Sequence, residues 1–113
     1  MGTRRTTQRS KRPRHFIREW RKYRGLTQQQ LADRVDVAVS SISQLENGKQ
    51  GYSQALLEAL ADALSCEPWD LLHNDPNKEG DVVDLTRLLK DASPEKKAEA
   101  IGFVKGLLRS NER

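Results

Sequence analysis

The sequence has little cysteine and few aromatic residues. Cys66 is the single cysteine among 113 residues, so an internal disulfide is excluded and a reducing, cytoplasmic compartment is expected. Aromatic residues make up 5% of the chain, and no apolar run approaches the roughly 18 residues that a membrane-spanning helix needs. With 35% hydrophobic and 32% charged residues, the chain can bury one small core, and we expect no membrane segment.

The sequence also lacks the usual signs of catalysis or metal binding. His15, Cys66 and His73 are too far apart in the sequence to form a recognised zinc pattern. Glycine-rich phosphate loops and nucleophile motifs are absent. We therefore expect no enzyme activity, no metal site and no cofactor.

Charge is distributed unevenly along the chain. Residues 1–24 contain ten Lys or Arg and one acid, whereas residues 25–113 contain ten Lys or Arg and fifteen acids, so the two parts carry formal charges of +9 and −5. Residues 1–13 have no acid and no hydrophobic periodicity, which predicts a flexible basic arm with an anionic partner, nucleic acid first. A solvated tail without a partner is the alternative. The cations expected to contact DNA here are Arg4, Arg5, Arg9, Lys11, Arg12 and Arg14.

From Arg14 onward the hydrophobic spacing is that of helices, and no strand pattern of any length occurs. Ile17 and Trp20 share a face of the first helix, which Gly25 ends. Thr27 and Gln30 have capping-box spacing, and Ser53 has the position of an N-cap. The further helices are predicted over residues 27–35, 38–47, from 53 to about 64, and 67–72. The expected fold class is all-α.

The C-terminal third predicts a linker followed by two helices. Residues 74–80, NDPNKEG, have the composition of a turn or linker, and a helical pair follows over residues 81–110. The apolar residues of the pair are Val82, Leu85, Leu88 and Leu89, then Ile101, Val104, Leu107 and Leu108, with Phe103 on the flank. The last helix is more apolar than a monomer's surface helix should be, which predicts a homodimer, or a monomer that dimerises on a palindromic operator. Burial of that stripe by the preceding helix is the alternative.

Helices 27–35 and 38–47 are joined by two or three residues, which is the helix-turn-helix arrangement. The segment from Ile17 to Leu72 resembles the lambdoid phage repressor and Cro family, often called the XRE family. The residues that carry the resemblance are Arg21, Gly25-Leu26-Thr27-Gln28, Leu31-Ala32, Val37, Ile42, Leu45-Glu46-Asn47-Gly48, Leu57, Ala61, Leu64 and Leu71-Leu72. The resemblance implies a five-helix DNA-binding domain over residues 14–73, whose third helix enters the major groove.

The outward face of helix 38–47 is short, uncharged and rich in hydrogen-bonding groups. Because Ile42 and Leu45 turn toward the core, the polar residues of this helix turn outward. Glutamine can pair bidentately with adenine, serine can donate or accept a hydrogen bond, and valine can touch a thymine methyl group. The predicted base-contacting residues are Val39, Ser40, Ser43 and Gln44. A solvated polar face without a ligand is the alternative.

Further roles follow only from the family resemblance. Gln28, at the start of the second helix, would bind a backbone phosphate and brace the third helix. Asn47, Lys49 and Gln50 would lie along the phosphates at the end of the third helix. Arg21 and Glu46 would form a structural ion pair that ties the first helix to the third.

Three positions depart from the family pattern. Asp36 stands where the turn usually has glycine, and Ser65 replaces a common glycine after the fourth helix. Ala38 stands where the family caps the third helix with Ser or Thr, an omission worth about 1 kcal/mol. We expect a somewhat less stable domain with the DNA contacts intact.

The sequence therefore predicts a sequence-specific DNA-binding transcriptional regulator that acts as a repressor on a double-stranded DNA operator. Two alternatives stay open. One is an antitoxin that binds both its operator and a toxin, and the other is a protein-interaction adaptor that has lost DNA binding.

Overall fold

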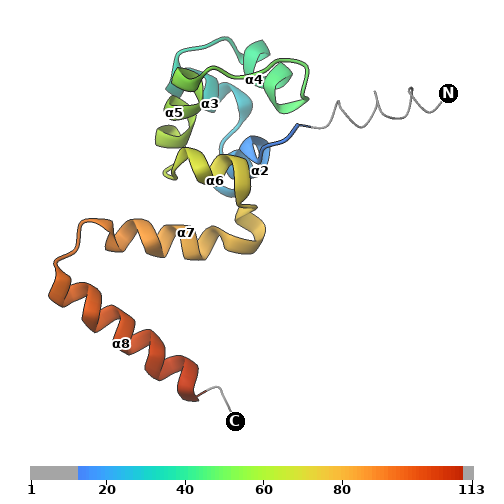
Figure 1. Cartoon of the computed structure of the whole chain (residues 1–113). Coiled ribbons are helices and arrows are strands. Elements are labelled where there is room, and N and C mark those ends of the chain that lie inside the picture. The colour runs from blue at the N-terminus through green and yellow to red at the C-terminus, as the bar shows by residue number, and fades with distance from the viewer. Residues whose placement is uncertain (1–12, 111–113) are drawn as a thin grey trace.

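The structure is a computed structural model that describes residues 13–110, and the regular secondary structure within that range is entirely helical, as the sequence predicts. Helices α2–α6 gather in one globule, α7 runs beneath it, and α8 extends away from it (Figure 1). The helices are α2 (Ile17–Tyr23), α3 (Gln28–Val35), α4 (Val39–Glu46), α5 (Gln54–Ala63), α6 (Pro68–His73), α7 (Pro76–Lys90) and α8 (Pro94–Ser110). No helix in the described range is long and apolar enough to cross a membrane.

The helix ends follow the local sequence. Thr27 and Gln30 form the predicted capping box, with Thr27 Oγ1 accepting from Gln30 N at 3.0 Å and Gln30 Oε1 accepting from Thr27 N at 2.8 Å. Ser53 Oγ accepts from Leu56 N and starts α5. Ala38 precedes α4 without a side-chain cap, as expected. The first helix begins at Ile17, three residues later than predicted.

One core holds α2–α6 together. Its largest fully buried side chains are Trp20, Ile17, Leu31, Ile42, Leu45, Leu60, Leu64 and Leu71. The Trp20 indole is also satisfied, because its Nε1 donates to Asn74 O at 2.9 Å and Asp70 O at 3.2 Å. The two carbonyls belong to α6 and to its C-cap residue, so the tryptophan joins α2 to α6 by both packing and hydrogen bonding.

Two non-glycine residues adopt left-handed backbone conformations. Asp36 has φ 59° between α3 and α4, and Ser65 has φ 57° after α5. These are the positions where the family pattern has glycine, so the side chains there carry the strain that glycine avoids. The Ser65 turn is held from outside by Arg24, whose guanidinium donates to Leu64 O at 2.7 Å and to Ser65 O at 3.0 Å.

The predicted linker over residues 74–80 is wrong from Pro76 onward, because α7 begins there. Asp75 Oδ1 accepts from Asn77 N at 3.0 Å, and Pro76 takes the first helical position. Aspartate at the N-cap followed by proline is a helix start as well as a turn signal, and here the helix start prevails. Only Asn74 and Asp75 separate α6 from α7.

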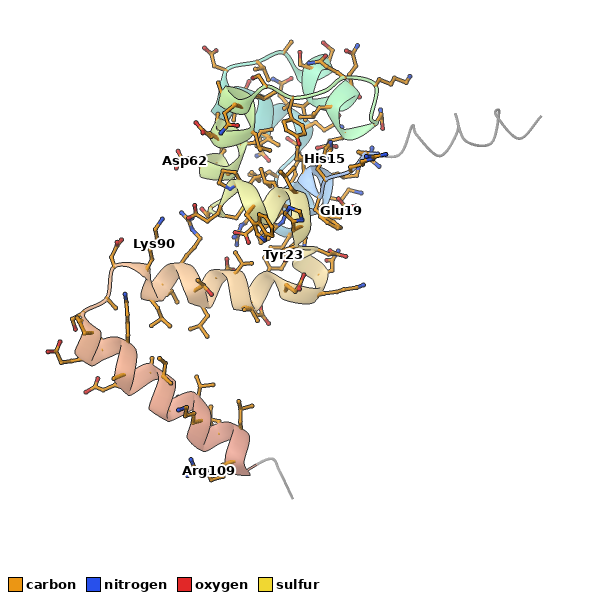
Figure 2. All side chains as sticks on the ribbon, viewed as in Figure 1. His15, Glu19, Tyr23, Asp62, Lys90 and Arg109 are labelled. Atoms are coloured by element: carbon orange, nitrogen blue, oxygen red, sulfur yellow. The ribbon has the colours of Figure 1, made fainter. Side chains whose placement is uncertain are left out.

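Helix α7 is packed on the globule. Val83 is buried in the common core, and Gly80 lies so close to the Tyr23 ring that an added Cβ would be 2.5 Å from Tyr23 Cζ. Figure 2 shows Tyr23 between the globule and α7. Arg24 donates to both carboxylate oxygens of Asp84, at 2.7 and 3.1 Å. The first point at which the chain leaves the packed unit is therefore the short turn between α7 and α8.

The predicted apolar stripe of α8 is exposed, and so is most of the stripe predicted for α7. The exposed residues on α7 are Val82 (63%), Leu85 (44%) and Leu88 (78%), and those on α8 are Ile101 (51%), Phe103 (69%), Val104 (38%), Leu107 (51%) and Leu108 (59%). Burial of the α8 stripe by α7 is therefore not what the structure shows. Ser93 Oγ accepts from Lys96 N at 3.2 Å and caps the start of α8.

Cys66 is expected to resist alkylation as long as the protein is folded. It is 3% exposed, and burial raises the pKa of its thiol to about 12, so almost no thiolate forms at pH 8. Treatment with iodoacetamide at pH 8, followed by intact-mass measurement, should leave the native chain unmodified and modify it fully in 8 M urea. Modification at equal rates in both conditions would contradict the burial.

Candidate nucleic-acid interface

Helices α3 and α4 form the helix-turn-helix unit. Asp36 ends α3 in its left-handed conformation, and Val37 N donates back to Ala32 O at 3.0 Å. Ala38 then directs the chain into α4. The connection is as short as the sequence predicted, so α4 is held firmly across α3.

The two sides of α4 differ sharply in exposure. Ile42, Leu45 and Glu46 are buried, at 0%, 0% and 1%. On the opposite side Ser40 and Gln44 are exposed, Val39 is 38% exposed, and Ser43 is half-buried. The predicted base-contacting residues are thus brought together on one uncharged polar surface.

Glu46 joins three helices at the buried side of α4. Its carboxylate accepts two hydrogen bonds from Arg21, at 2.6 Å from Nε and 3.0 Å from Nη2, so the predicted ion pair is formed. It also accepts from Gln28 Nε2 at 3.0 Å and lies 3.4 Å from Arg18 Nε. Burial raises the pKa of Glu46, but the hydrogen bonds from Arg21, Gln28 and Arg18 outweigh it, and the pKa lies below its usual value. Glu46 is therefore ionised in the folded protein at neutral pH.

A Schellman motif closes the end of α4. Gly48 has φ 77°, its N–H donates to Leu45 O at 3.1 Å, and Lys49 N donates to Gln44 O at 2.9 Å. Gln50 N also donates to Gln44 O, at 3.2 Å. Because these amides are occupied, a phosphate approaching Lys49 or Gln50 would be met by their exposed side chains.

The start of α2 lies beside this loop. Phe16 N donates to Leu71 O at 2.6 Å and fixes the chain entering α2. The His15 ring packs edge-on against Tyr52, with ring centroids 6.1 Å apart, and Arg14 is exposed. The pKa of His15 is lowered by burial, so its ring is neutral at pH 7. Arg4, Arg5, Arg9, Lys11 and Arg12 lie outside the described residues, but the chain that follows them is fixed to Leu71 of α6 and packs against Tyr52 in the loop after α4.

Known proteins are similar to this chain over the segment that contains the helix-turn-helix unit. The helix-turn-helix family model matches residues 17–69. An HTH-type transcriptional regulator from Methanothermobacter thermautotrophicus is 46% identical over 54 residues, which are 48% of this chain and 78% of that protein. The chain belongs to the helix-turn-helix family of transcriptional regulators. The regulator is therefore a DNA-binding protein, and the resemblance to the XRE family is confirmed.

Other similar proteins extend the comparison. A competence pilus inhibition repressor from Acinetobacter baylyi is 48% identical over 69 residues, covering 59% of the regulator and 63% of that protein's length. The clp gene regulator ClgR from Corynebacterium glutamicum has a TM-score of 0.50 at 28% identity, over 69% of the regulator and 86% of the ClgR chain. A chain of the SinR–SinI complex has a TM-score of 0.52 at 23% identity, over 85% and 95% of the two chains, and shows the fold alone.

Sequence reasoning missed two arginines of the regulator. In the sequence, Arg18 and Arg24 stand out only as part of the basic charge of residues 1–24. Arg24 joins α2 to Asp84 of α7 and to the carbonyls after α5, and lies 5.2 Å from the centroids of Trp20 and Tyr23. Arg18 Nη2 donates to Asn47 Oδ1 at 2.6 Å. The spacing of Arg18 and Arg21 on one helix face could have suggested that both serve Glu46.

Proposed function

We propose that the regulator is a sequence-specific repressor that reads the major groove with α4. The observation that carries the proposal is the exposed, uncharged face of α4, on which Val39, Ser40 and Gln44 stand out from a helix whose other side is buried. A helix without long cations on its outer face can approach base edges closely, and glutamine, serine and valine suit adenine and thymine. Ser43 lies on the same face and completes the proposed base-contacting set.

Phosphate contacts are proposed on either side of that face. Lys49 and Gln50 offer exposed side chains beyond α4, and Asn47 is exposed at the helix end. Gln28 already donates to Glu46, so we propose that its second amide hydrogen serves a phosphate at the start of α3. These groups would position α4 without reading sequence.

Selection of binding sites from random duplex DNA tests this function. The regulator should enrich one short motif, and a promoter carrying that motif should drive less reporter expression when the regulator is present. Enrichment of no motif would contradict sequence-specific binding, and a rise in expression would contradict repression. The 48%-identical relative is named a repressor, which supports repression over activation.

Gln44→Ala should weaken binding to the selected site by about 1–3 kcal/mol and relax the preference at one base pair. Binding to random duplex should hardly change, because the exposed Gln44 side chain is proposed to contact bases and not phosphates. Fluorescence anisotropy with both duplexes measures the two affinities. Equal losses on the two duplexes would remove Gln44 from the base-contacting set.

Deleting residues 1–13 should flatten the salt dependence of DNA binding. The deletion removes Arg4, Arg5, Arg9, Lys11 and Arg12. Each lost phosphate contact lowers the slope of log affinity against log salt by about 0.9. A binding series from 50 to 300 mM NaCl measures the slope, and circular dichroism checks that the fold is kept. An unchanged slope would show that the arm does not touch DNA.

We further propose that α8 joins two copies of the regulator. Ile101, Val104 and Leu108 form an exposed apolar stripe on a helix that extends away from the globule (Figure 1). A self-complementary contact between two such helices would bury the stripe and place two α4 helices on one operator. In this arrangement residues 13–90 form the DNA-binding unit and residues 94–110 the dimer contact.

A further inference from the structure

We propose that Arg18 is a positioning residue, which orients the Asn47 amide so that its NH₂ group faces a DNA phosphate. Neither the family resemblance nor the comparisons assign a role to Arg18. The proposal rests on the proposed function, in which Asn47 contacts the backbone at the end of α4.

The contact joins the beginning of one helix to the end of another. Arg18 lies in the first turn of α2, and Asn47 is the C-cap residue of α4. Arg18 Nη2 donates to Asn47 Oδ1 at 2.6 Å, the short distance of a charge-assisted hydrogen bond. The Arg18 side chain is 41% exposed, and Asn47 is exposed. The pair therefore lies at the surface, where a ligand can reach it.

The chemistry of the pair selects one amide orientation. Guanidinium groups donate hydrogen bonds and accept none, whereas an asparagine amide has an acceptor at Oδ1 and two donors at Nδ2. A flipped Asn47 amide would place its NH₂ against the Arg18 guanidinium, with donors facing donors. The carbonyl oxygen is thus held inward, and both N–H groups of Nδ2 are left on the other side. Fixing this orientation before binding removes part of the ordering cost that DNA contact would otherwise carry.

Arg18 is itself held in place by Glu46. Its Nε lies 3.4 Å from Glu46 Oε1, on a carboxylate that also pairs bidentately with Arg21. The Arg18 guanidinium is thus held at two points, by Glu46 at Nε and by Asn47 at Nη2. These two contacts favour a bracing role for Arg18 over that of a free cation seeking a phosphate.

The test combines Arg18→Met, Asn47→Ala and the double variant, measured on the selected site and on random duplex over a salt series. Arg18→Met should weaken binding about two- to tenfold, the range of one hydrogen bond, and equally on both duplexes because a phosphate contact reads no sequence. The salt slope should stay unchanged, since Asn47 is neutral. In the Asn47→Ala background Arg18→Met should have no further effect, and Arg18→Lys, which keeps a cationic donor, should recover part of the loss.

Lys22→Met is the matched control, because it removes one cation from an exposed position of the same helix. When it is combined with Asn47→Ala, the loss of DNA affinity caused by Asn47→Ala should stay the same. The melting temperature of each variant is recorded beside its affinity, and the loss of binding should persist at temperatures where all variants are folded.

Three results would overturn the proposal. A slope lower by about 0.9, with the loss persisting in the Asn47→Ala background, would make Arg18 a direct phosphate ligand. Unchanged binding by Arg18→Met, while the wild type binds duplex DNA, would remove the role of Arg18 and leave the proposed function standing. No duplex binding by the wild type would overturn both.

Discussion

Replacing Glu46 with alanine should lower the free energy of unfolding by about 3–5 kcal/mol. Glu46 is 1% exposed, and its carboxylate accepts hydrogen bonds from Arg21, Gln28 and Arg18. Removing it leaves the guanidinium of Arg21, a residue that is 8% exposed, without a counter-charge inside the protein. Domains of this size are stable by only about 5–15 kcal/mol, so the variant should be close to unfolding at 37 °C.

Urea denaturation followed by circular dichroism measures this loss. Glu58→Ala is the matched control, because Glu58 is exposed on α5 and pairs with Gln54 one turn away. The control should change stability by less than about 0.5 kcal/mol. A loss below 1 kcal/mol in Glu46→Ala would show that the buried ion pair is not needed to hold α4.

The pH dependence of stability provides a second check on the Glu46 carboxylate. The folded-state pKa of Glu46 lies below its unfolded value, so the stabilisation it contributes is complete above the unfolded pKa, about 4.3. It is lost as the pH falls through the folded-state value. Between pH 7 and pH 3 the wild type should therefore lose more stability than Glu46→Ala does.

Placing two acids in the α8 stripe should abolish the proposed dimer. Ile101→Glu with Leu108→Glu adds two negative charges to residues that are 51% and 59% exposed in the single chain. Losing the link between two DNA-binding units should lower affinity for a palindromic operator by about two to four orders of magnitude. Affinity for an isolated half-site should stay the same. Sedimentation equilibrium gives the mass, and anisotropy gives the two affinities.

Arg109→Glu changes the net charge by the same two units on an exposed α8 residue that lies about a quarter turn around the helix from Ile101 and Leu108. It should leave the dimer intact. Truncation after Lys90 is the second comparison, since α7 must be kept for Val83 and Asp84 to stay in place. A wild-type chain that remains monomeric at high micromolar concentration and binds a palindrome without cooperativity would contradict the dimer.

Most of the fold could be predicted because local signals and packing agree. The capping box at Thr27, the cap at Ser53 and the spacing of Ile17 and Trp20 all predict the helices that form. The start of α7 was missed because Asp75 and Pro76 also occur in turns, and Gly80 suggested an end to regular structure. Gly80 is instead needed inside the helix, where the Tyr23 ring occupies the space of a side chain. That contact joins residues 57 positions apart and leaves no local pattern.

The candidate site was predictable in part for the same reason. The outward face of α4 follows from helical periodicity once Ile42 and Leu45 are assigned to the core. The family resemblance predicts the ion pair of Arg21 and Glu46, and the structure contains it. The contact of Arg18 with Asn47 depends on how α2 crosses the end of α4, which is a tertiary relationship that sequence spacing does not encode.

The division of α4 into a buried and an exposed side has a consequence for how such regulators diversify. Ile42, Leu45 and Glu46 are buried and hold α4 in the fold, whereas Ser40 and Gln44 are exposed. Substitutions at exposed positions usually change stability by less than about 0.5 kcal/mol. Under the proposed function, the DNA target can therefore be changed through these few exposed residues while the buried residues that hold α4 in place are kept.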